Sequence, residues 1–432
     1  MSSTPSNRQE QAVSDSVSVL PIIICVAAIL RVVSIFILRT YLTPNTWEFG
    51  EIAHVIMAGL GYTVTFSDGV RVPSAYMPPF YPYLLTGLWS TLGESGRTYL
   101  MLELLQALLG VVLVFYIYRL ASLLFSPLVA STAAVIAAVW PAFIYLCNEF
   151  HSINFYIVLG VAAVYHLVRY IELSRSRKDA TCLGLYMGAL FYCRAEAGLL
   201  LAVYATILVW RCGRKSLLHA AITCIIALAC ISPWTIRNYK VFGHPVVVTT
   251  SGGINLWVGH NPHATGNSTW SMDYATPEQQ RELKSFLGRP DSEVLQNVQA
   301  GKFAVEFVRL HPQQEARLVT KKVFLFLLFD PEHKKGSHIT YWGPSLLLLL
   351  VALYGAWLHK GNLFTKDLPL VASIAFAFFM GLAVFVVPRY RIAIDPFLVI
   401  FAANALVALF PRGRVMLRGK LQNIRRYLSV QE

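Results

Sequence analysis

The chain has 432 residues, of which 56% are hydrophobic and only 14% are charged. Ordinary soluble domains contain roughly 45–50% apolar and about 25% charged residues, so this composition excludes a water-soluble enzyme and indicates a membrane protein. The formal net charge is +13, from 36 Lys and Arg against 23 Asp and Glu. In a membrane protein such an excess reports orientation, so we expect a lipid bilayer as partner and no nucleic acid.

Ten apolar runs approach the length of about 20 residues that a helix needs to cross a bilayer. Two of them are short and leave open a single long helix with a break, so we expect about ten spans, within two. The first is predicted to be an uncleaved span, because it has no small-residue cleavage site. The runs are 20–38, 98–122, 127–147, 153–171, 180–193, 196–211, 216–233, 341–358, 368–387 and 392–410.

Basic residues predict how these spans are oriented. Lys and Arg gather in the connectors that follow 153–171, 196–211 and 341–358, and again in the C-terminal tail. By the positive-inside rule these connectors and both termini are cytoplasmic. The two long connectors then lie on the extracytoplasmic side, where we expect the chemistry to take place.

This orientation predicts five segments. They are a cytoplasmic tail (1–19), a transmembrane domain (20–233) with a first outer loop (39–97), a large outer loop with interfacial helices (234–340), the C-terminal spans (341–411) and a basic cytoplasmic tail (412–432).

The first outer loop opens with an amphipathic pattern. Glu48, Glu51 and His54 recur every three residues opposite an apolar stripe, which predicts a short helix at the membrane interface. Two carboxylates one turn apart are candidates for a general base. Asn45 stands three residues before Glu48, close to a capping box, so a purely structural role for Glu48 is the alternative.

Residues 74–83 follow in the same loop, with three prolines in five positions among aromatic residues that include Tyr76 and Tyr81. Prolines at this density predict an irregular segment rather than a helix. The aromatic side chains favour either a groove lining or a seat on lipid headgroups.

The second outer loop contains a glycine-rich stretch. Gly252 and Gly253 indicate a close backbone approach or a tight turn, and polar and aromatic residues of the kinds that bind sugars follow them. Further on, Pro277 is expected at the first position of a helix. Residues 291–311 read as a second amphipathic helix, and 321–329 is too short to span and should lie in the interface.

Ionisable residues gather at the outer ends of the spans under this topology, where they are costly and favour a function. The arginine fork matches phosphate oxygens, so acids and arginines on one face suit a reaction on a lipid phosphate. Interhelical ion pairing, for instance Arg194 with Glu196, is the alternative. Arg31 lies mid-span, where we expect a structural role with a partner such as Glu103. The residues at the outer ends are Glu103, Glu149, His151, Arg194, Glu196, Arg389 and Arg391.

An ordered set of segments resembles a known family. The segments are Trp47–Ala53, Tyr76–Pro82, Cys193–Glu196, Pro233–Tyr239, Gly252–Pro262 and Pro388–Arg391. In this order they resemble the bacterial membrane glycosyltransferases of the GT-C fold, relatives of the protein O-mannosyltransferases (glycosyltransferase family 39) and of the aminoarabinose transferase of lipid A. The resemblance covers roughly residues 20 to 410. It implies an all-α polytopic membrane protein with about ten transmembrane helices and two large extracytoplasmic loops, in a bacterial inner membrane.

The resemblance also implies an activity. The donor would be a sugar on a polyprenyl phosphate, and the acceptor a hydroxyl of a glycan, lipid or protein. Glu48 or Glu51 would be the general base, and attack by the acceptor would invert the anomeric carbon. The best-known relatives have an Asp in this loop, whereas no Asp occurs between 40 and 66 here; we favour Glu48, with Glu51 second.

Arginines would hold the departing lipid phosphate: Arg389 and Arg391 first, with Arg194 or Arg237 as further candidates. No Asp-x-Asp motif or His cluster marks a metal site, so we assign no cofactor and leave a divalent cation open. The candidate substrate-binding residues are His54, Tyr76, Tyr81, Glu149, Asn255, Trp257, His260 and Asn261.

Three alternatives remain. A lipid-linked glycan ligase or polymerase has a similar architecture but would depend on arginine and histidine instead of an acidic first loop. A transporter would show an internal repeat and broken helices near the midplane, and we find no such repeat. The third alternative is a catalytically silent partner subunit.

Overall fold

The computed structural model describes residues 5–65, 71–268, 275–328 and 339–410. Within these ranges the chain is helical apart from short connections and one antiparallel strand pair, β1 (Thr63–Thr65) and β2 (Arg71–Pro73). The first four residues of the predicted N-terminal tail, and the whole of the predicted basic tail 412–432, lie outside the described residues.

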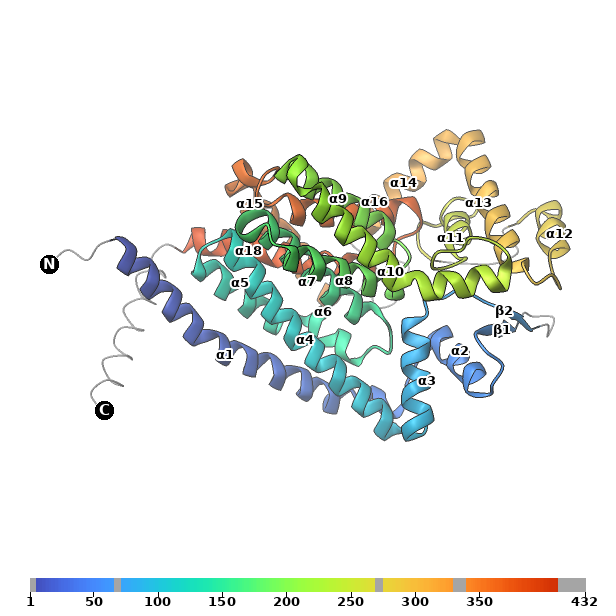
Figure 1. Cartoon of the computed structure of the whole chain (residues 1–432), viewed down its shortest axis with the longest axis horizontal. Helices are drawn as coiled ribbons and strands as arrows, with labels where there is room; N and C mark the ends of the chain where they lie inside the picture. The colour runs from blue at the N-terminus through green and yellow to red at the C-terminus, as the bar shows by residue number, and fades with distance from the viewer. Residues whose placement is uncertain (1–4, 66–70, 269–274, 329–338, 411–432) are drawn as a thin grey trace.

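The helices fall into a long bundle and a smaller group at one end of it (Figure 1). The bundle contains α1 (Pro5–Leu38), α4 (Gly96–Leu124), α5 (Pro127–Val139), α6 (Pro141–Tyr145), α7 (Ile153–Arg169), α8 (Arg177–Cys193), α9 (Ala197–Cys212), α10 (Leu217–Phe242), α15 (Ile339–Leu358), α16 (Leu368–Ala383) and α18 (Asp395–Leu409). The remaining helices are α2 (Trp47–Met57), α3 (Phe80–Leu92), α11 (Gly252–Gly259), α12 (Pro277–Ser285), α13 (Ser292–Leu310), α14 (Pro312–Leu327) and α17 (Pro388–Ile392).

Each predicted span coincides with a helix or with a bent pair of helices. Among the described residues, four helices are long and apolar enough to cross a membrane. The number is five if α5 and the helical segment Pro141–Asn148, which meet at an angle of 52°, count as one span. Helices α9, α15, α16 and α18 are apolar but shorter. The chain is therefore an all-α polytopic membrane protein, whereas the number ten stays a prediction. The runs 180–193 and 196–211 form two separate helices.

The outer surface of the bundle is apolar, as lipid contact requires. Ile22, Ile29 and Phe36 of α1 stand seven residues apart on one helix face and are 64%, 60% and 51% exposed. Because soluble proteins rarely expose continuous apolar stripes, this face indicates a lipid-facing surface. The opposite face of α1 packs against α4 and α5.

Arg31 lies on that inner face and is fully buried. Its guanidinium donates to the carbonyl oxygens of Ala138 (3.1 Å) and Ala137 (3.3 Å), at the end of α5. The last carbonyls of a helix have no partner within the helix, so the arginine satisfies groups that the break after α5 leaves unpaired. The predicted partner Glu103 is not among its contacts; Glu103 accepts a hydrogen bond from Thr40 instead.

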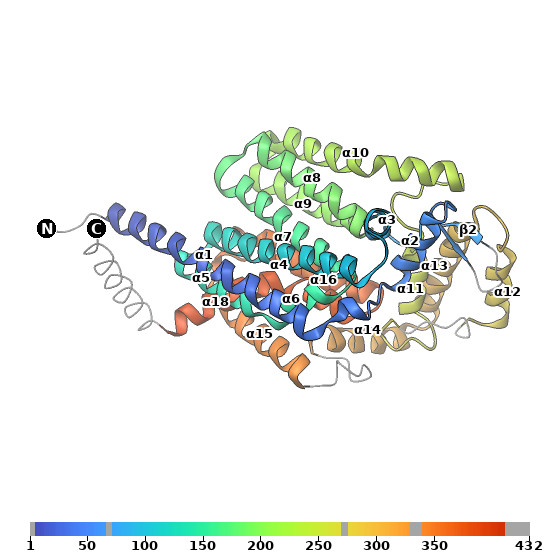
Figure 2. The same ribbon diagram turned by 90° about the horizontal axis from the view of Figure 1, so that it is seen from below.

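The two long connectors come together at one end of the bundle, to the right in both views (Figures 1 and 2). We call residues 39–95 and 243–328 the outer unit. Arg237 donates to the carbonyl oxygens of Ser74 (2.7 Å) and Tyr62 (2.9 Å). The amide of Thr250 donates to the carbonyl oxygen of Ala75 (3.0 Å). These bonds join the first loop to the second.

Glu293 of α13 strengthens this junction. Its buried carboxylate accepts the Ala75 amide at 2.7 Å and the Thr250 hydroxyl. Burial raises the pKa of Glu293, and its hydrogen bonds partly oppose the shift. The two outer loops therefore form one body, although the residues bonded across the junction are more than 150 positions apart in the chain.

Helix α10 extends further than the predicted span, which ends at residue 233. Pro233 has no amide hydrogen to donate. The carbonyl of Ala229, which that hydrogen would have reached, instead accepts the hydroxyl of Ser232 at 2.8 Å. The helix continues to Phe242 and carries Arg237 to the outer unit.

Residues 74–83 are irregular only as far as Pro79, which is the N-cap of α3. The prediction of an irregular segment was wrong for the last four residues, because Pro82 occupies the first turn. Helix positions there need no amide donor, so proline is tolerated. The predicted helices in the second loop are confirmed: α12 begins at Pro277 with a Thr276–Gln279 capping box, and α13 covers 292–310.

Candidate functional site

Glu48 stands in the first turn of α2, and its side chain is exposed. The predicted capping box is absent: Asn45 accepts the amide of Trp47 at 3.1 Å, and the N-cap residue Thr46 makes no side-chain bond. Within the described ranges no hydrogen bond or ion pair engages the Glu48 carboxylate. The carboxylate is therefore available to a substrate.

The backbone in front of Glu48 is strained. Trp47 has φ 52°, in the left-handed region that bulky residues rarely adopt. Such conformations cost of order 1–3 kcal/mol and tend to occur at functional sites. Gly50 is also required here, because a Cβ at this position would overlap the side chain of Thr46.

Arg389 of α17 interacts electrostatically with Glu48 of α2. Burial has the largest effect on the pKa of its guanidinium and lowers it. Among the neighbouring groups, Tyr390 and the carboxylates of Glu48 and Glu149 raise this pKa, whereas Arg194 lowers it. In the described part of the chain the guanidinium has no hydrogen-bond partner, and its one aromatic contact is the Tyr390 ring at 6.0 Å. Among the described residues, the charge of the unpaired Arg389 guanidinium is thus balanced by the unpaired carboxylates of Glu48 and Glu149.

Glu149 comes from the turn between α6 and α7. Its carboxylate has no hydrogen-bond or ion-pair partner among the described residues. His151, two residues on, packs its ring edge-to-face on Phe49 of α2, with centroids 5.0 Å apart. Its Nδ1 accepts the amide of Ile153 at 3.1 Å. This packing holds the Glu149 turn against α2.

His151 is neutral in this position. Burial lowers its pKa well below the ordinary value, and the charges of Arg389 and Arg194 lower it further. The positive charge of the site therefore belongs to the arginines.

Arg194 lies between the rings of Tyr156 (5.4 Å) and Tyr390 (4.6 Å) and pairs with Glu196. The interhelical ion-pair alternative thus describes Arg194 correctly. Because Glu196 neutralises it, Arg194 serves mainly to seat the Tyr390 ring, which stacks on the guanidinium. Tyr390 in turn fixes the position of Arg389, its neighbour in the chain.

Two tyrosines of the first loop border the site. Tyr76 has a raised pKa, from burial first and then from the charges of Glu48, Glu293 and Tyr390. It therefore lies close to the candidate base Glu48, to Glu293 of α13 and to Tyr390 of α17. Tyr81 is fully buried against Phe49, with ring centroids 5.3 Å apart. Its hydroxyl has no hydrogen-bond partner within the described residues.

The other arginine candidates have structural partners. Arg391 pairs with buried Asp395 and donates to the carbonyl of Ser345 at 3.1 Å. Arg237 is engaged by backbone carbonyls of the first loop and packs over the Trp234 ring at 4.9 Å. Neither guanidinium is as free for a phosphate as that of Arg389.

His54 and Glu51 lie on α2 but away from this group. His54 contacts Glu94 at 2.7 Å and stacks on Trp89, with centroids 4.6 Å apart. Glu51 is exposed, and no described interaction links its carboxylate to Arg389 or Arg194. Of the two candidate bases, Glu48 is the one that shares a site with the arginines.

The candidates on α11 belong to the interior of the outer unit. Trp257 packs against Phe303 of α13, and Asn261 donates to the carbonyl of Trp257 at 2.8 Å. His260 is buried against Glu315, and Asn255 is half-buried on the same helix. The expected close approach occurs at Gly253, where a Cβ would overlap the carbonyl oxygen of Asn297.

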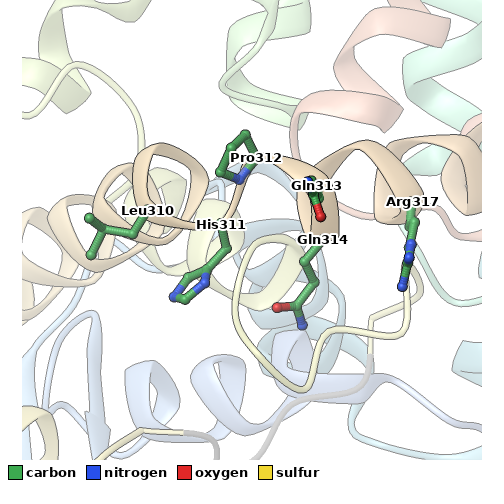
Figure 3. Close-up of a pocket in the computed structure, with 6 residues that line it drawn as sticks. All are labelled: Leu310, His311, Pro312, Gln313, Gln314 and Arg317. Carbon is green, nitrogen blue, oxygen red and sulfur yellow. The ribbon is translucent and has the colours of Figure 1, made fainter.

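A separate polar hollow of about 590 Å³ lies at the turn between α13 and α14 (Figure 3). It contains none of the candidate residues. Its lining is Leu310, His311, Pro312, Gln313, Gln314 and Arg317. In the described part of the chain, no three His, Cys, Asp or Glu side chains gather as ligands for one metal ion.

Sequence reasoning omitted Tyr390, Tyr156 and Glu293 from the site. Tyr390 lies in the segment Pro388–Arg391, between the two arginines, but the sequence assigned it no role. Tyr156 and Glu293 carried no signal, since each reads as one more residue of a regular helix. Their roles depend on contacts made across the fold.

Comparison with known proteins supports the resemblance. Residues 76–236 match the family model described as dolichyl-phosphate-mannose-protein mannosyltransferase. This segment includes Glu149 and Arg194 but neither Glu48 nor Arg389. A search of curated proteins finds no match.

Solved structures of one archaeal enzyme show the same fold. The apo oligosaccharyltransferase of Archaeoglobus fulgidus is 16% identical with a TM-score of 0.57, over 95% of this chain and 52% of that one. The same protein, AglB, in complex with an inhibitory peptide and a dolichol-phosphate is 15% identical, with the same TM-score and coverage. Apo ArnT from Cupriavidus metallidurans is 13% identical, with a TM-score of 0.36, over 87% of this chain and 76% of that one.

The chain thus has the GT-C fold and spans about half the length of AglB. The resemblance drawn from the sequence is confirmed for the family model and the fold.

Proposed function

We propose that this chain is a membrane glycosyltransferase that moves a sugar from a polyprenyl-phosphate donor to an acceptor hydroxyl. One observation carries the proposal: the guanidinium of Arg389, which has no hydrogen-bond partner among the described residues, interacts electrostatically with the carboxylates of Glu48 and Glu149. A cation for a leaving phosphate and a base for an incoming hydroxyl are the two groups that such a transfer requires. The family model and the fold support the same activity class.

Glu48 acts as the general base in this mechanism. Its carboxylate takes the proton of the acceptor hydroxyl while that oxygen attacks the anomeric carbon of the sugar. The bond between this carbon and the phosphate oxygen breaks, and its electron pair leaves with the lipid phosphate. Attack opposite the leaving group inverts the anomeric carbon.

Arg389 stabilises the negative charge that grows on the departing phosphate. A guanidinium can donate two parallel hydrogen bonds to phosphate oxygens. Tyr390, held by Arg194, keeps the Arg389 backbone in place. Glu149 orients hydroxyl groups of the sugar or of the acceptor substrate, because its carboxylate can accept hydrogen bonds from them.

The proposed location follows from the topology. A polyprenyl donor stays in the bilayer, so its phosphate reaches the site at the membrane surface. Tyr76 and Glu48 belong to the outer unit, which would receive the acceptor from water. We place this end of the bundle on the extracytoplasmic side of a bacterial inner membrane, and both termini in the cytoplasm.

A transfer assay tests the proposal. Purified protein is incubated with radiolabelled sugars on polyprenyl monophosphate or diphosphate and with an envelope extract as acceptor. Glu48→Gln should lower kcat by about 10²–10⁴-fold, the usual contribution of a general base. Exposed Glu282 of α12 offers a matched control, and Glu282→Gln should transfer at the wild-type rate.

The outcomes separate the assignments. Loss of transfer in Glu51→Gln but not in Glu48→Gln would move the base one turn along α2. Transfer from diphosphate-linked glycans alone would favour the oligosaccharide ligase alternative. No transfer of label by the wild type from either donor would contradict the proposed activity.

A further inference from the structure

A lysine is buried completely in α14, away from the candidate site. The Lys322 side chain is 0% exposed, and its Nζ donates to the carbonyl oxygen of Leu382 at 3.1 Å. The same Nζ lies 3.0 Å from Nε2 of His260. Burying an ammonium group is costly unless polar partners compensate it, so its partners indicate what it does.

His260 extends the arrangement to a carboxylate. Its Nδ1 lies 2.9 Å from Oε1 of Glu315, and its Nε2 lies 2.9 Å from the carbonyl oxygen of Ala383. Glu315 is also on α14, two turns before Lys322, whereas His260 directly follows α11. We call these three residues the Lys322–His260–Glu315 triad.

The triad meets the C-terminal end of α16. Leu382 and Ala383 are the last two residues of that helix, and the last carbonyls of a helix have no partner within it. Positive side chains are also favoured at helix C-termini by the helix dipole. Lys322 therefore caps α16 from another part of the chain, with His260 packed between it and the Ala383 carbonyl.

Neighbouring contacts hold the residues that follow. Gly259 approaches Val384 so closely that a Cβ would overlap its carbonyl oxygen. The amide of Val386 donates to the carbonyl of Gly266 at 2.9 Å. The link between α16 and α17 is thus fixed to the outer unit over residues 382–386.

This link leads directly to the candidate site. The ring of Phe385 stacks on Tyr390, with centroids 6.1 Å apart and planes at 22°. Tyr390 packs under Arg194 and adjoins Arg389. The position of the end of α16 consequently sets the position of the arginine that faces Glu48.

We propose that Lys322 and His260 are positioning residues, which act through the capped end of α16 to hold Arg389 and Tyr390 at the donor phosphate. The kinetic side of this inference rests on the proposed function. Methionine could fill the lysine's volume without the cost of a buried charge, so the lysine is better explained by the geometry that its hydrogen bonds impose than by stability.

Lys322→Met tests the inference in the full-length protein. We expect faster amide hydrogen exchange over residues 384–390 and a donor KM raised about tenfold, the order expected for loss of a hydrogen bond to a charged group. The acceptor KM should stay unchanged. Glu315→Gln, which keeps an oxygen to accept from His260, should shift both readouts in the same direction by less. Lys302→Met, on exposed α13 surface, is the matched control and should change neither.

A double-mutant cycle with Arg389→Ala distinguishes positioning from a general structural defect. If Lys322 acts through Arg389, Lys322→Met should raise the donor KM no further in the Arg389→Ala background. Unchanged exchange over 384–390, or an equal increase in KM in both backgrounds, would overturn the inference. An unchanged donor KM in Arg389→Ala alone would contradict the proposed role of Arg389, and the exchange data would then decide on the triad by themselves.

Discussion

Four arginines near the end of the bundle that carries the outer unit differ in the groups that already bind them. Arg194 has Glu196, Arg391 has Asp395, and Arg237 has backbone carbonyls. Arg389 has only an aromatic neighbour in the part of the chain that the structure describes. Chemical availability, rather than charge alone, therefore favours Arg389 for the proposed phosphate-binding role.

This difference predicts opposite phenotypes for two arginines that stand two residues apart. Arg389→Ala should leave the melting temperature near wild type and raise the donor KM. Arg391→Ala should leave Asp395 as an unpaired buried charge and destabilise the protein by about 3–5 kcal/mol. Thermal unfolding in detergent together with donor titration checks both; a stable Arg391→Ala variant with a raised donor KM would reverse the assignment.

Sequence reasoning proposed the residue types of the candidate site but could not give their partners. The spacing of Glu48 and Glu51 placed both on a short helix, yet nothing in the spacing tells which carboxylate faces Arg389. That depends on how α17 sits beside α2, a contact between distant parts of the chain. The pairing of Arg391 with Asp395 did carry a local signal, since the two are four residues apart.

At the scale of elements, close packing of helices depends on a few glycines. Helices α15 and α18 pack along their length, and a Cβ at Gly355 would overlap the carbonyl oxygen of Phe401. Small residues that let two backbones approach are common at helix contacts in membranes. Gly160 of α7, in contrast, has open space around its position.

Gly355→Ala should therefore destabilise the protein by about 1–3 kcal/mol, the usual cost of overpacking. Gly160→Ala should be neutral or stabilising by about 0.5–1 kcal/mol, because alanine favours the helix. Melting temperatures of the two variants provide the check. Equal melting temperatures would mean that α15 can move away from α18 at little cost.

The buried Lys322 of α14 should make the stability of the protein depend on pH. Burial lowers the pKa of Lys322 to about 8, against the partial opposition of Glu315, whereas the unfolded chain keeps the ordinary value near 10.5. Between these values the unfolded state binds more protons, so the free energy of unfolding rises with pH across that window, by at most about 1.4 kcal/mol per unit.

Lys322→Met lacks this group, so the melting temperature of the wild type should rise relative to the variant between pH 8 and about 10.5. Melting curves of both proteins, recorded over the same buffers, give the difference directly. Parallel curves would show that the lysine is not desolvated as the structure indicates.

Helix boundaries were predictable where hydrophobic runs end and failed where proline was taken as a terminator. Pro233 and Pro82 both lie inside helices, because a side-chain donor or a first-turn position removes the penalty. The polar residues of α11 looked like sugar ligands, yet most of them are buried in the outer unit. Their burial depends on α13 and α14, which a local pattern does not reveal.

For the molecule as a whole, both long connectors lie at one end, and α1 begins at the other (Figures 1 and 2). The alternation of short basic and long neutral connectors in the sequence predicts this arrangement, since successive spans must change sides. How the two outer loops join was not predictable, because Glu293 and Arg237 bind backbone groups, which have no sequence signature.

Cysteine labelling can determine the orientation. In a background without the seven native cysteines, a cysteine at Lys302 of α13 should react with a membrane-impermeant reagent in right-side-out vesicles. A cysteine at Lys360, after α15, should react only in inside-out vesicles. Both sites lie away from the candidate residues, so the fold should tolerate them. The opposite pattern would place the candidate site in the cytoplasm.

The spacing of the candidate residues along the chain also determines when the site can exist during synthesis. Glu48 follows the first span and Glu149 comes next, but Arg389 arrives only on the segment before α18. A chain that is still being inserted therefore presents carboxylates without their cation and cannot stabilise a leaving phosphate. Under the proposed function, lipid-linked sugar in the membrane would be safe from a nascent chain, because the proposed phosphate-binding arginine is synthesised only with α17.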